Sequence, residues 1–238
     1  MKAIILSAGY GTRLGELTKE MPKPMLDING KPMLEYIINN LRDHNFTDLI
    51  INLHFKPEKI KNYFGDGTNF GVKISYVYEK ELLGTAGGVK NVESFFKETS
   101  EPFLVHYGDV VNEQNFTKML KFHKEKNALA TLLLHQRKKS NSIVCLDEEN
   151  RIINFLERPS DEERKGIKSP WVNSGVCICS LEILDLIPEN TACDLPRDIF
   201  SRNVQTNKLF GFPLSAFRCA IDSQERLKLV KDHYNQVG

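Results

Sequence analysis

Two glycines and two basic residues gather near the start of the chain. Gly9 and Gly11 follow a short apolar run, and glycine at such a position lets backbone N–H groups approach an anion closely. Thr12 adds a hydroxyl donor, and the Arg13 guanidinium is a planar fork of donors that suits phosphate. Lys23 lies between two prolines, which stiffen the backbone that presents it. This combination predicts a polyphosphate-binding site.

The segment matches neither of two common phosphate-binding motifs. A P-loop needs Gly-Lys followed by Ser or Thr, and a dinucleotide fingerprint needs a third glycine where the chain has Leu14. An acidic residue about 20 positions further on, after a second strand, is also missing. A dinucleotide oxidoreductase is therefore disfavoured. From spacing alone, a glycine turn with solvated basic side chains is the alternative interpretation.

The patterning around this segment is typical of an α/β fold. Helices are expected at 32–41, 57–64, 87–96 and 222–235, and strands at 2–8, 48–53, 72–78, 103–107, 128–135, 142–147, 152–156 and 172–180. The charged stretch 161–168 is expected to be a mobile surface loop. The alternation in the first half predicts a Rossmann-like, doubly wound sheet, and the strands of the second half predict an antiparallel or mixed extension of it.

Length and composition narrow the class of protein. The 238 residues suit one large domain, with no linker that cuts the chain into independent parts. The 32 basic and 31 acidic residues give a net charge of +1, which argues against a nucleic-acid-binding protein. No apolar run approaches the roughly 20 residues of a membrane span. Five cysteines without a Cys-x-x-Cys pair favour the cytoplasm and argue against structural zinc.

A series of motifs resembles the sugar-phosphate nucleotidyltransferases. Gly-x-Gly-Thr-Arg-Leu at 9–14 is followed by Pro-Lys-Pro at 22–24, Leu-Gly-Thr-Ala-Gly at 83–87, Gly-Asp at 108–109, Phe-Leu-Glu-Arg-Pro at 155–159 and Asn-x-Gly at 173–175. The resemblance points to the branch that contains mannose-1-phosphate guanylyltransferases, and related heptose-phosphate enzymes share much of it. It implies a GT-A-like fold in a single domain, 1–238. In that domain, 1–115 mainly binds the nucleotide and 116–238 mainly binds the sugar phosphate.

The resemblance also implies a reaction. A nucleotidyl group would pass from an NTP, with GTP favoured, to a mannose- or heptose-like sugar 1-phosphate, with release of pyrophosphate. Uridylyl or cytidylyl transfer, and a non-catalytic sugar-nucleotide sensor on the same fold, stay open. Arg13 should hold the leaving phosphates, and Lys23 should stabilise charge on the α-phosphate. The other residues implied in nucleotide binding are Leu6, Ala8, Gly9, Gly11, Thr12, Glu79, Gly84, Thr85 and Gly108. Those implied in sugar-phosphate binding are Gly87, Glu157, Arg158, Asn173 and Gly175.

A divalent metal is expected, because a triphosphate and a sugar phosphate repel each other. Asp109 follows a strand-like run, and a carboxylate at the carboxyl end of a strand faces the ligand crevice of an open α/β sheet. The resemblance implies Asp222 as the second acid, although this residue could equally cap a helix with Glu225 as its partner. Two carboxylates and phosphate oxygens suit Mg²⁺. The expected partners are thus an NTP, a sugar 1-phosphate and Mg²⁺, and a homo-oligomer is left open.

Overall fold

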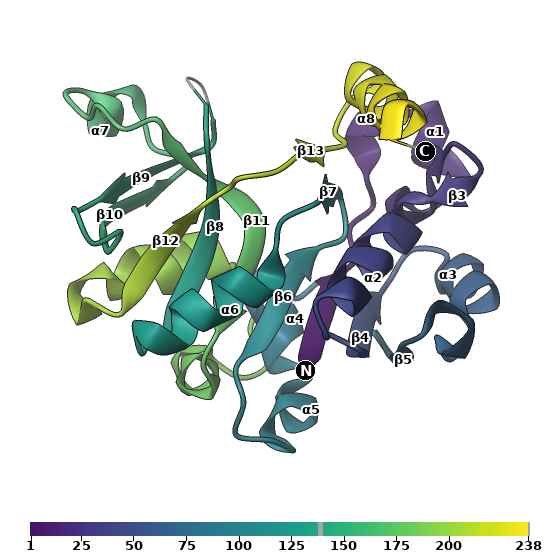
Figure 1. The fold of residues 1–238 in the computed structure, drawn as a ribbon, viewed down its shortest axis with the longest axis horizontal. Coiled ribbons are helices and arrows are strands. Elements are labelled where there is room, and N and C mark those ends of the chain that lie inside the picture. Colours follow the sequence, from purple (N-terminus) through teal and green to yellow (C-terminus); the bar gives the residue numbers. More distant parts are fainter. Residues whose placement is uncertain (138–139, 238) are drawn as a thin grey trace. The chain divides into compact units, whose positions relative to one another are not determined.

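The computed structural model describes residues 1–137 and 140–237 of the chain (Figure 1). These residues form two compact units, each assembled from separate stretches of sequence. The first unit contains Met1–Leu82, His106–Phe116 and Ser215–Gly238, and the second contains Leu83–Val105 and Thr117–Leu214. The chain therefore passes between the units several times. The functional division near residue 115 does not follow this boundary and stays a prediction.

The first unit contains a parallel sheet. Strand β1 (Lys2–Leu6) pairs with β4 (Asp48–Leu53), and β4 pairs with β5 (Lys73–Tyr78). Strands β1 and β4 are almost entirely buried, as their continuous apolar runs predict. Leu6 lies opposite Asn52, so the two strands end together. The loop that follows β1 consequently starts beside the end of β4.

The helices of the first unit bury one apolar side. In α2 (Met33–Asp43) the buried positions include Met33, Ile37 and Leu41, which repeat once per helical turn. Helix α3 (Pro57–Phe64) buries Ile60 and Phe64 in the same way. Both helices were expected from the sequence. The shorter elements of this unit are α1 (Glu16–Lys19), β2 (Asp27–Ile28) and β3 (Lys31–Pro32).

A smaller core lies under the C-terminal helix of the first unit. Helix α8 (Gln224–Val237) packs over β7 (Val110–Asn112) and β13 (Arg218–Ala220), which pair antiparallel (Figure 1). Val230 of the helix is fully buried against Val111 of β7, among other residues. The helix was predicted, whereas the two three-residue strands are too short to leave a pattern. This core holds the loop before β7 beside the end of β13.

The second unit contains a mixed sheet. Strand β8 (Ala130–Gln136) pairs antiparallel with β11 (Trp171–Cys179) and parallel with β12 (Leu209–Pro213). Strand β9 (Ser142–Leu146) pairs antiparallel with β10 (Ile152–Glu157) and with the start of β11. The prediction of antiparallel or mixed pairing in the second half of the chain is confirmed, with β12 as a strand that the sequence did not reveal.

The predicted helix at 87–96 is wrong, because the structure has two helices there. Helix α4 (Gly84–Lys90) ends before Val92, where the backbone leaves helical geometry (φ −119°), and α5 (Glu93–Lys97) then begins. The Val92 side chain is buried at this break.

Strand β6 (Phe103–Tyr107) is the strand at which the chain passes from the second unit to the first. Helix α6 (Phe116–Glu125) comes after β6 and β7.

The stretch 161–168, predicted as a loop, begins with helix α7 (Asp161–Arg164). The Ser160 hydroxyl accepts a hydrogen bond from the Glu163 N–H, and the Glu163 carboxylate accepts one from the Ser160 N–H. This capping box satisfies two backbone donors and starts the helix. The spacing of Ser and Glu was visible in the sequence and was missed. Further helical turns lie at Leu181–Leu186, Leu195–Phe200 and Ser201–Thr206.

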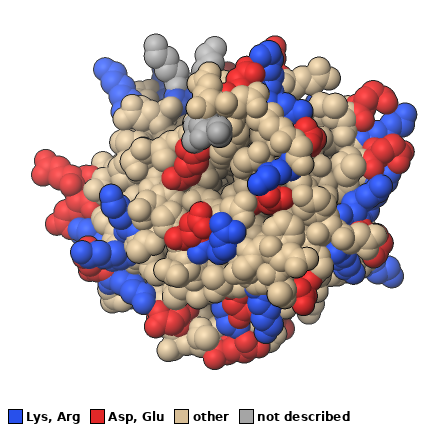
Figure 2. All heavy atoms as spheres, turned by 45° about the vertical axis from the view of Figure 1, so that its right-hand side comes forward, with Lys and Arg blue, Asp and Glu red and all other residues tan. Residues whose placement is uncertain are grey.

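The surface carries charges of both signs. Acidic and basic side chains intermingle over the face drawn in Figure 2, in line with the net charge of +1.

Within residues 1–137 and 140–237, no helix is both long enough and apolar enough to cross a bilayer.

Candidate functional site

The glycine loop after β1 lies against Lys23. Gly11 opens the turn Thr12–Leu14 in the left-handed conformation (φ +67°), which glycine adopts without steric cost. A Cβ on Gly11 would lie 3.0 Å from the Cβ of Lys23, so this glycine permits the close approach. Gly9 is exposed and the Arg13 side chain is 70% exposed. The loop therefore presents backbone and guanidinium donors at the surface of the first unit.

Lys23 makes a partly buried ion pair with Asp109. The lysine begins a helical turn after Pro22, its side chain is only 9% exposed, and its Nζ lies 2.7 Å from the Asp109 Oδ2. The Asp109 side chain is 33% exposed. A hydrogen bond between two charged groups at this distance is among the stronger polar contacts in proteins. The structure thus joins a predicted catalytic cation to a predicted metal ligand.

Asp109 comes directly before β7 and Asp222 follows β13 by two residues, so the antiparallel pairing of these strands brings the two backbone segments together. The Ile221 N–H donates to the Asp109 carbonyl (3.0 Å), which extends the pairing of β7 with β13. The Asp222 carboxylate lies 3.8 Å from Arg13 Nη1 and 3.2 Å from Arg226 Nε. The two ion pairs Lys23–Asp109 and Arg13–Asp222, on adjoining backbone segments, are called the cation–carboxylate cluster below. Arg226 was not predicted as part of it.

The cluster supplies donors that fit a hard cation. Two carboxylates on neighbouring backbone segments offer oxygen ligands, which Mg²⁺ prefers. Among the residues that the structure describes, no group of three or more His, Cys, Asp or Glu side chains is placed to hold a metal ion by itself. A Mg²⁺ ion held by these two carboxylates would need its remaining ligands from phosphate oxygens and water.

A buried amide anchors the start of the glycine loop. Asn52, at the end of β4, is 2% exposed; its Oδ1 accepts from the Ser7 N–H (2.6 Å) and its Nδ2 donates to the Glu79 carboxylate (2.7 Å). Glu79 was predicted among the nucleotide-binding residues, and the structure buries it, 3% exposed, in this chain of contacts. Sequence reasoning missed Asn52. A lone polar residue in the buried run of β4 was the available signal.

Gly108 allows two chain segments to touch. Its N–H donates to the Leu6 carbonyl (2.9 Å), and a Cβ on Gly108 would lie 2.4 Å from the Ser7 Oγ. The glycine therefore has a packing reason that was not foreseen, and its role toward a nucleotide stays a prediction. Of the other residues predicted to bind the nucleotide at the end of β1, Leu6 is half-buried, Ala8 is buried and Gly9 is exposed.

The Leu-Gly-Thr-Ala-Gly motif packs against the segment 191–195 within the second unit. A Cβ on Gly84 (φ +73°) would lie 2.5 Å from a carbonyl oxygen of that segment, and a Cβ on Gly87 would lie 2.8 Å from another. Thr85 donates to the Asp194 carboxylate through its N–H (3.2 Å) and its hydroxyl (3.3 Å). These contacts explain both glycines by packing. Their predicted roles toward base and sugar stay predictions.

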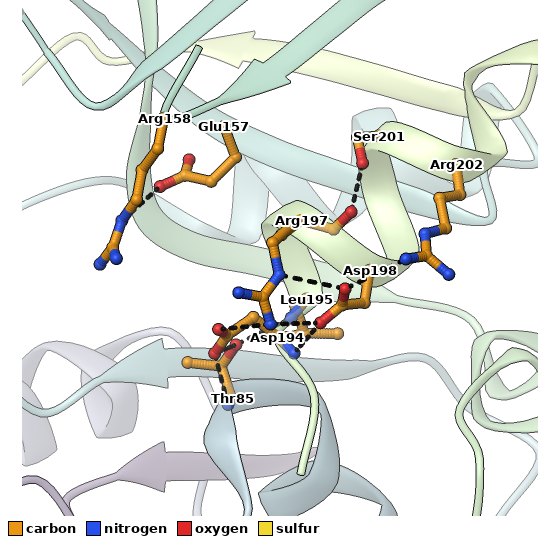
Figure 3. A network of polar contacts seen from close by, with 9 residues as sticks. All are labelled: Thr85, Glu157, Arg158, Asp194, Leu195, Arg197, Asp198, Ser201 and Arg202. Atoms are coloured by element: carbon orange, nitrogen blue, oxygen red, sulfur yellow. Dashed lines mark hydrogen bonds and ion pairs between the residues drawn. The ribbon is translucent and has the colours of Figure 1, made fainter. Parts of the chain in front are cut away.

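Glu157 and Arg158 stand at the end of β10. The Arg158 side chain is 79% exposed, and its Nε lies 4.0 Å from the Glu157 Oε1. Burial raises the pKa of Glu157 to about 6, with Arg158 opposing this shift and Asp194 adding to it. Figure 3 shows the Glu157 carboxylate turned toward Arg158, with Asp194 and Arg197 on the neighbouring segment. A carboxylate with this pKa can change its protonation state near neutral pH.

Arg197 links the acidic residues of that neighbouring segment. It forms two contacts with Asp198, at 3.1 Å and 3.0 Å, and lies 3.6 Å from Asp194 (Figure 3). Arg202 also lies near Asp198, at 3.5 Å. None of these residues was predicted, because the segment matches no motif. The spacing of Asp and Arg at three and four positions was the signal that could have indicated the pairs.

Asn173 and Gly175 lie in an irregular part of β11. The pairing with β8 shifts register between Asn173 and Cys177, and Gly175 has φ +80°. The Asn173 Oδ1 accepts from the Gly175 N–H (3.1 Å). Asn173 and Gly175, two of the five residues predicted to bind the sugar phosphate, therefore contact each other at a bulge. Bulges are common near binding sites.

Comparison with known proteins assigns the chain to a family. Residues 2–212 match the model of the family described as nucleotidyl transferase. The chain is 35% identical over 223 residues to a UTP–glucose-1-phosphate uridylyltransferase of Synechocystis sp., covering 88% of the chain and 57% of that protein. It is 32% identical over 214 residues to a mannose-1-phosphate guanylyltransferase of Mycobacterium tuberculosis, covering 88% of the chain and 58% of that protein. The chain belongs to the nucleotidyl transferase family.

A solved structure supports the fold. The chain is similar to a UDP-glucose pyrophosphorylase complexed with UDP-glucose, with a TM-score of 0.83 at 18% identity over 100% of the chain and 99% of the other protein. The predicted mixed α/β nucleotidyltransferase fold and the predicted family resemblance are both confirmed. The chain spans 57% and 58% of the lengths of the Synechocystis and Mycobacterium relatives. Those relatives are named for different nucleotides and sugars, so the family alone does not define the substrates.

Proposed function

We propose that this chain transfers a nucleotidyl group from an NTP to a sugar 1-phosphate, giving an NDP-sugar and pyrophosphate. The observation that carries the proposal is the cation–carboxylate cluster. It joins two cations from the glycine-loop region to two carboxylates that suit a divalent metal. GTP and a mannose- or heptose-like sugar 1-phosphate are the favoured substrates. The motif Leu-Gly-Thr-Ala-Gly at 83–87 and the guanylyltransferase relative support this choice.

The reaction requires the chain to position the substrates and to stabilise phosphate charge, and it does not require a general base. The attacking oxygen of a sugar 1-phosphate is already anionic at neutral pH, so no side chain has to remove a proton. Arg13 holds the leaving β- and γ-phosphates, and Lys23 stabilises the charge that grows on the α-phosphate. Asp109 and Asp222 would hold Mg²⁺, which would supply charge neutralisation for the phosphates. Glu157 and Arg158 hold the hydroxyls and the phosphate of the sugar.

A substrate panel tests this function. The four common NTPs are each paired with mannose, glucose and heptose 1-phosphates in the presence of Mg²⁺, and pyrophosphate release is measured. We expect the highest rate with GTP. Highest rates with UTP and glucose 1-phosphate would support the alternative of uridylyl transfer, which the Synechocystis relative favours. Binding of NDP-sugars without turnover in any pairing would point to a non-catalytic sensor.

Variants link the activity to the cluster. Lys23→Ala and Asp109→Ala should each lower kcat by about 100-fold or more, the scale seen when one stabilising group of a transition state is lost. Lys2→Gln is the matched control, since Lys2 pairs with Asp48 (3.6 Å), its side chain is equally buried (9% exposed), and it lies at the other end of β1. A Lys23 variant with the rate of the control would contradict the assigned role.

A further inference from the structure

The first turn of α4 is capped by a residue that lies 109 positions further along the chain than Thr85. The first N–H groups of a helix have no acceptor within it, and Leu83, directly before α4, carries no side-chain oxygen. The Thr85 N–H instead donates to the Asp194 carboxylate (3.2 Å), and the Ala86 N–H donates to the Cys193 carbonyl (2.9 Å). Asp194 therefore does for α4 what a polar N-cap residue does in other helices.

The Thr85 hydroxyl adds to the same contact. It donates to the Asp194 carboxylate (3.3 Å) and accepts from the N–H of Leu195 (2.8 Å), a residue that is fully buried. The Asp194 N–H in turn donates to the Asp198 carboxylate (2.8 Å), which holds the Asp194 backbone from the other side. Within the second unit, Asp194 thus fastens the first turn of α4 to a segment that is itself anchored.

The Asp194 carboxylate also acts on the charge of Glu157. Burial raises the pKa of Glu157 to about 6, Arg158 opposes this shift, and Asp194 adds to it. The cause of the Asp194 effect is repulsion between two carboxylates, which disfavours loss of the Glu157 proton. Arg197 lies 3.6 Å from Asp194 but forms its shorter contacts, 3.0 and 3.1 Å, with Asp198 (Figure 3). The negative charge of Asp194 is therefore only partly neutralised.

We propose that Asp194 is a positioning residue of the sugar-binding site: its carboxylate caps the first turn of α4, and its charge acts on Glu157. The helical turn Leu195–Phe200, which Asp194 precedes, packs against both α4 and β10. Gly87 lies in α4 and Glu157 ends β10, and both were predicted to bind the sugar phosphate. This inference rests on the proposed function, since it assigns the sugar to those two residues.

Two variants of Asp194 separate the cap from the charge. Asp194→Asn keeps an oxygen that accepts from Thr85 but removes the charge, whereas Asp194→Ala removes both. Amide hydrogen exchange should show the Thr85 N–H about fivefold less protected in Asp194→Ala, the effect of one lost hydrogen bond, and unchanged in Asp194→Asn. Nuclear magnetic resonance titration of the Glu157 carboxyl should give a lower pKa in both variants than in the wild-type chain, because the neighbouring negative charge is gone.

The binding of an NDP-sugar tests the consequence for the site. GDP-mannose is the probe, with UDP-glucose in its place if the substrate panel favours uridylyl transfer. Calorimetry on the full chain at pH 8 should show about fivefold weaker binding to Asp194→Ala and wild-type binding to Asp194→Asn. At pH 5.5, Asp194→Asn should bind the probe more tightly than the wild-type chain, because more of its Glu157 is ionised.

Asp147→Asn is the matched control. The Asp147 carboxylate also accepts from two N–H groups (3.0 and 2.8 Å) and lies near an arginine (3.7 Å). It follows β9 at the end of the β9–β10 pair opposite to Glu157. This variant should change neither the titration of Glu157 nor the affinity for the probe. A change equal to that of Asp194→Asn would indicate a general charge effect and overturn the inference.

Three further results would also overturn it: an unchanged affinity of Asp194→Ala for the probe, an unchanged protection of the Thr85 N–H in that variant, or an unchanged titration of Glu157 in Asp194→Asn. If Asp194→Ala fails to fold, which thermal unfolding would reveal, Thr85→Val replaces it, and wild-type affinity there would reject the cap. Turnover by the wild-type chain together with any of these results rejects only the inference. A wild-type chain without turnover that binds no NDP-sugar rejects the proposed function and the sugar-site role of Asp194, while exchange and titration still decide whether Asp194 caps α4 and acts on Glu157.

Discussion

Replacement of Asn52 by leucine should loosen the glycine loop, because leucine keeps the branched shape of the side chain but makes no hydrogen bond. The substitution removes two buried hydrogen bonds, one from the Ser7 N–H (2.6 Å) and one to the Glu79 carboxylate (2.7 Å). A buried donor left without its acceptor costs about 1–3 kcal/mol, and loss of a bond to a charged group costs more. The expected loss in the free energy of unfolding is therefore about 3–5 kcal/mol. For a chain of this size each kcal/mol lowers Tm by about 2–4 °C.

The pH dependence of Asn52→Asp makes the test specific. This change keeps an acceptor for Ser7 but places a second carboxylate next to that of Glu79, and two carboxylates so close cannot both be ionised. The folded state then retains a proton that the unfolded state releases above about pH 4. Stability must fall as pH rises from 5 to 8, because the folded state binds more protons there. The double variant Asn52→Asp with Glu79→Gln restores a donor and should regain stability at pH 8.

Chemical unfolding at pH 5 and pH 8 gives the midpoints for all variants, and pyrophosphate release reports on the loop. The reasoning is refuted if Asn52→Leu unfolds at the wild-type midpoint. It is refuted equally if Asn52→Asp is as stable at pH 8 as at pH 5, or if Glu79→Gln does not rescue it. Loss of stability without any change in kcat or KM would show that the anchor does not govern the position of the loop.

Three other expectations concern the second unit. The pKa of the buried Glu157 is about 6, so protonation of Glu157 should raise the KM for sugar 1-phosphate as pH falls through that value. Glu157→Gln should abolish this part of the pH dependence of KM. The part that comes from ionisation of the substrate should remain in both enzymes. Burial lowers the pKa of His123 to about 4, so the unfolded state binds a proton that the folded state does not between pH 6.5 and 4. Stability is lost as pH falls through that window, by about 2–3 kcal/mol for this group, and His123→Gln should reduce the loss in unfolding experiments at pH 7 and 4.5. Gly84→Ala should destabilise by about 2–4 kcal/mol, from its left-handed backbone and a Cβ 2.5 Å from a carbonyl oxygen. Gly30→Ala, with φ +88° and open space around the Cβ, is the control and should lose only the backbone part in thermal unfolding.

Local spacing in the sequence was enough to predict several elements. Strand β4 and helix α3 have the expected bounds, because a continuous apolar run and a helical repeat are properties of neighbouring residues. The break at Val92 was not predictable in this way, since burial of that side chain depends on the rest of the second unit. The capping box at Ser160 shows the opposite case, a local signal that was present and was overlooked.

By itself, the sequence determined the glycine-loop segment, most of the longer strands and helices, and the family. Those features rest on residues that are close along the chain. Only the tertiary structure decided that Lys23 meets Asp109, 86 positions away, and that Asn52 anchors Ser7, 45 positions away. The Asn52 contact follows from the register in which β1 meets β4, whereas the Lys23 contact joins the turn at Lys23–Met25 to the segment before β7. Each of these contacts joins segments that are far apart along the chain, so no pattern among neighbouring residues records it.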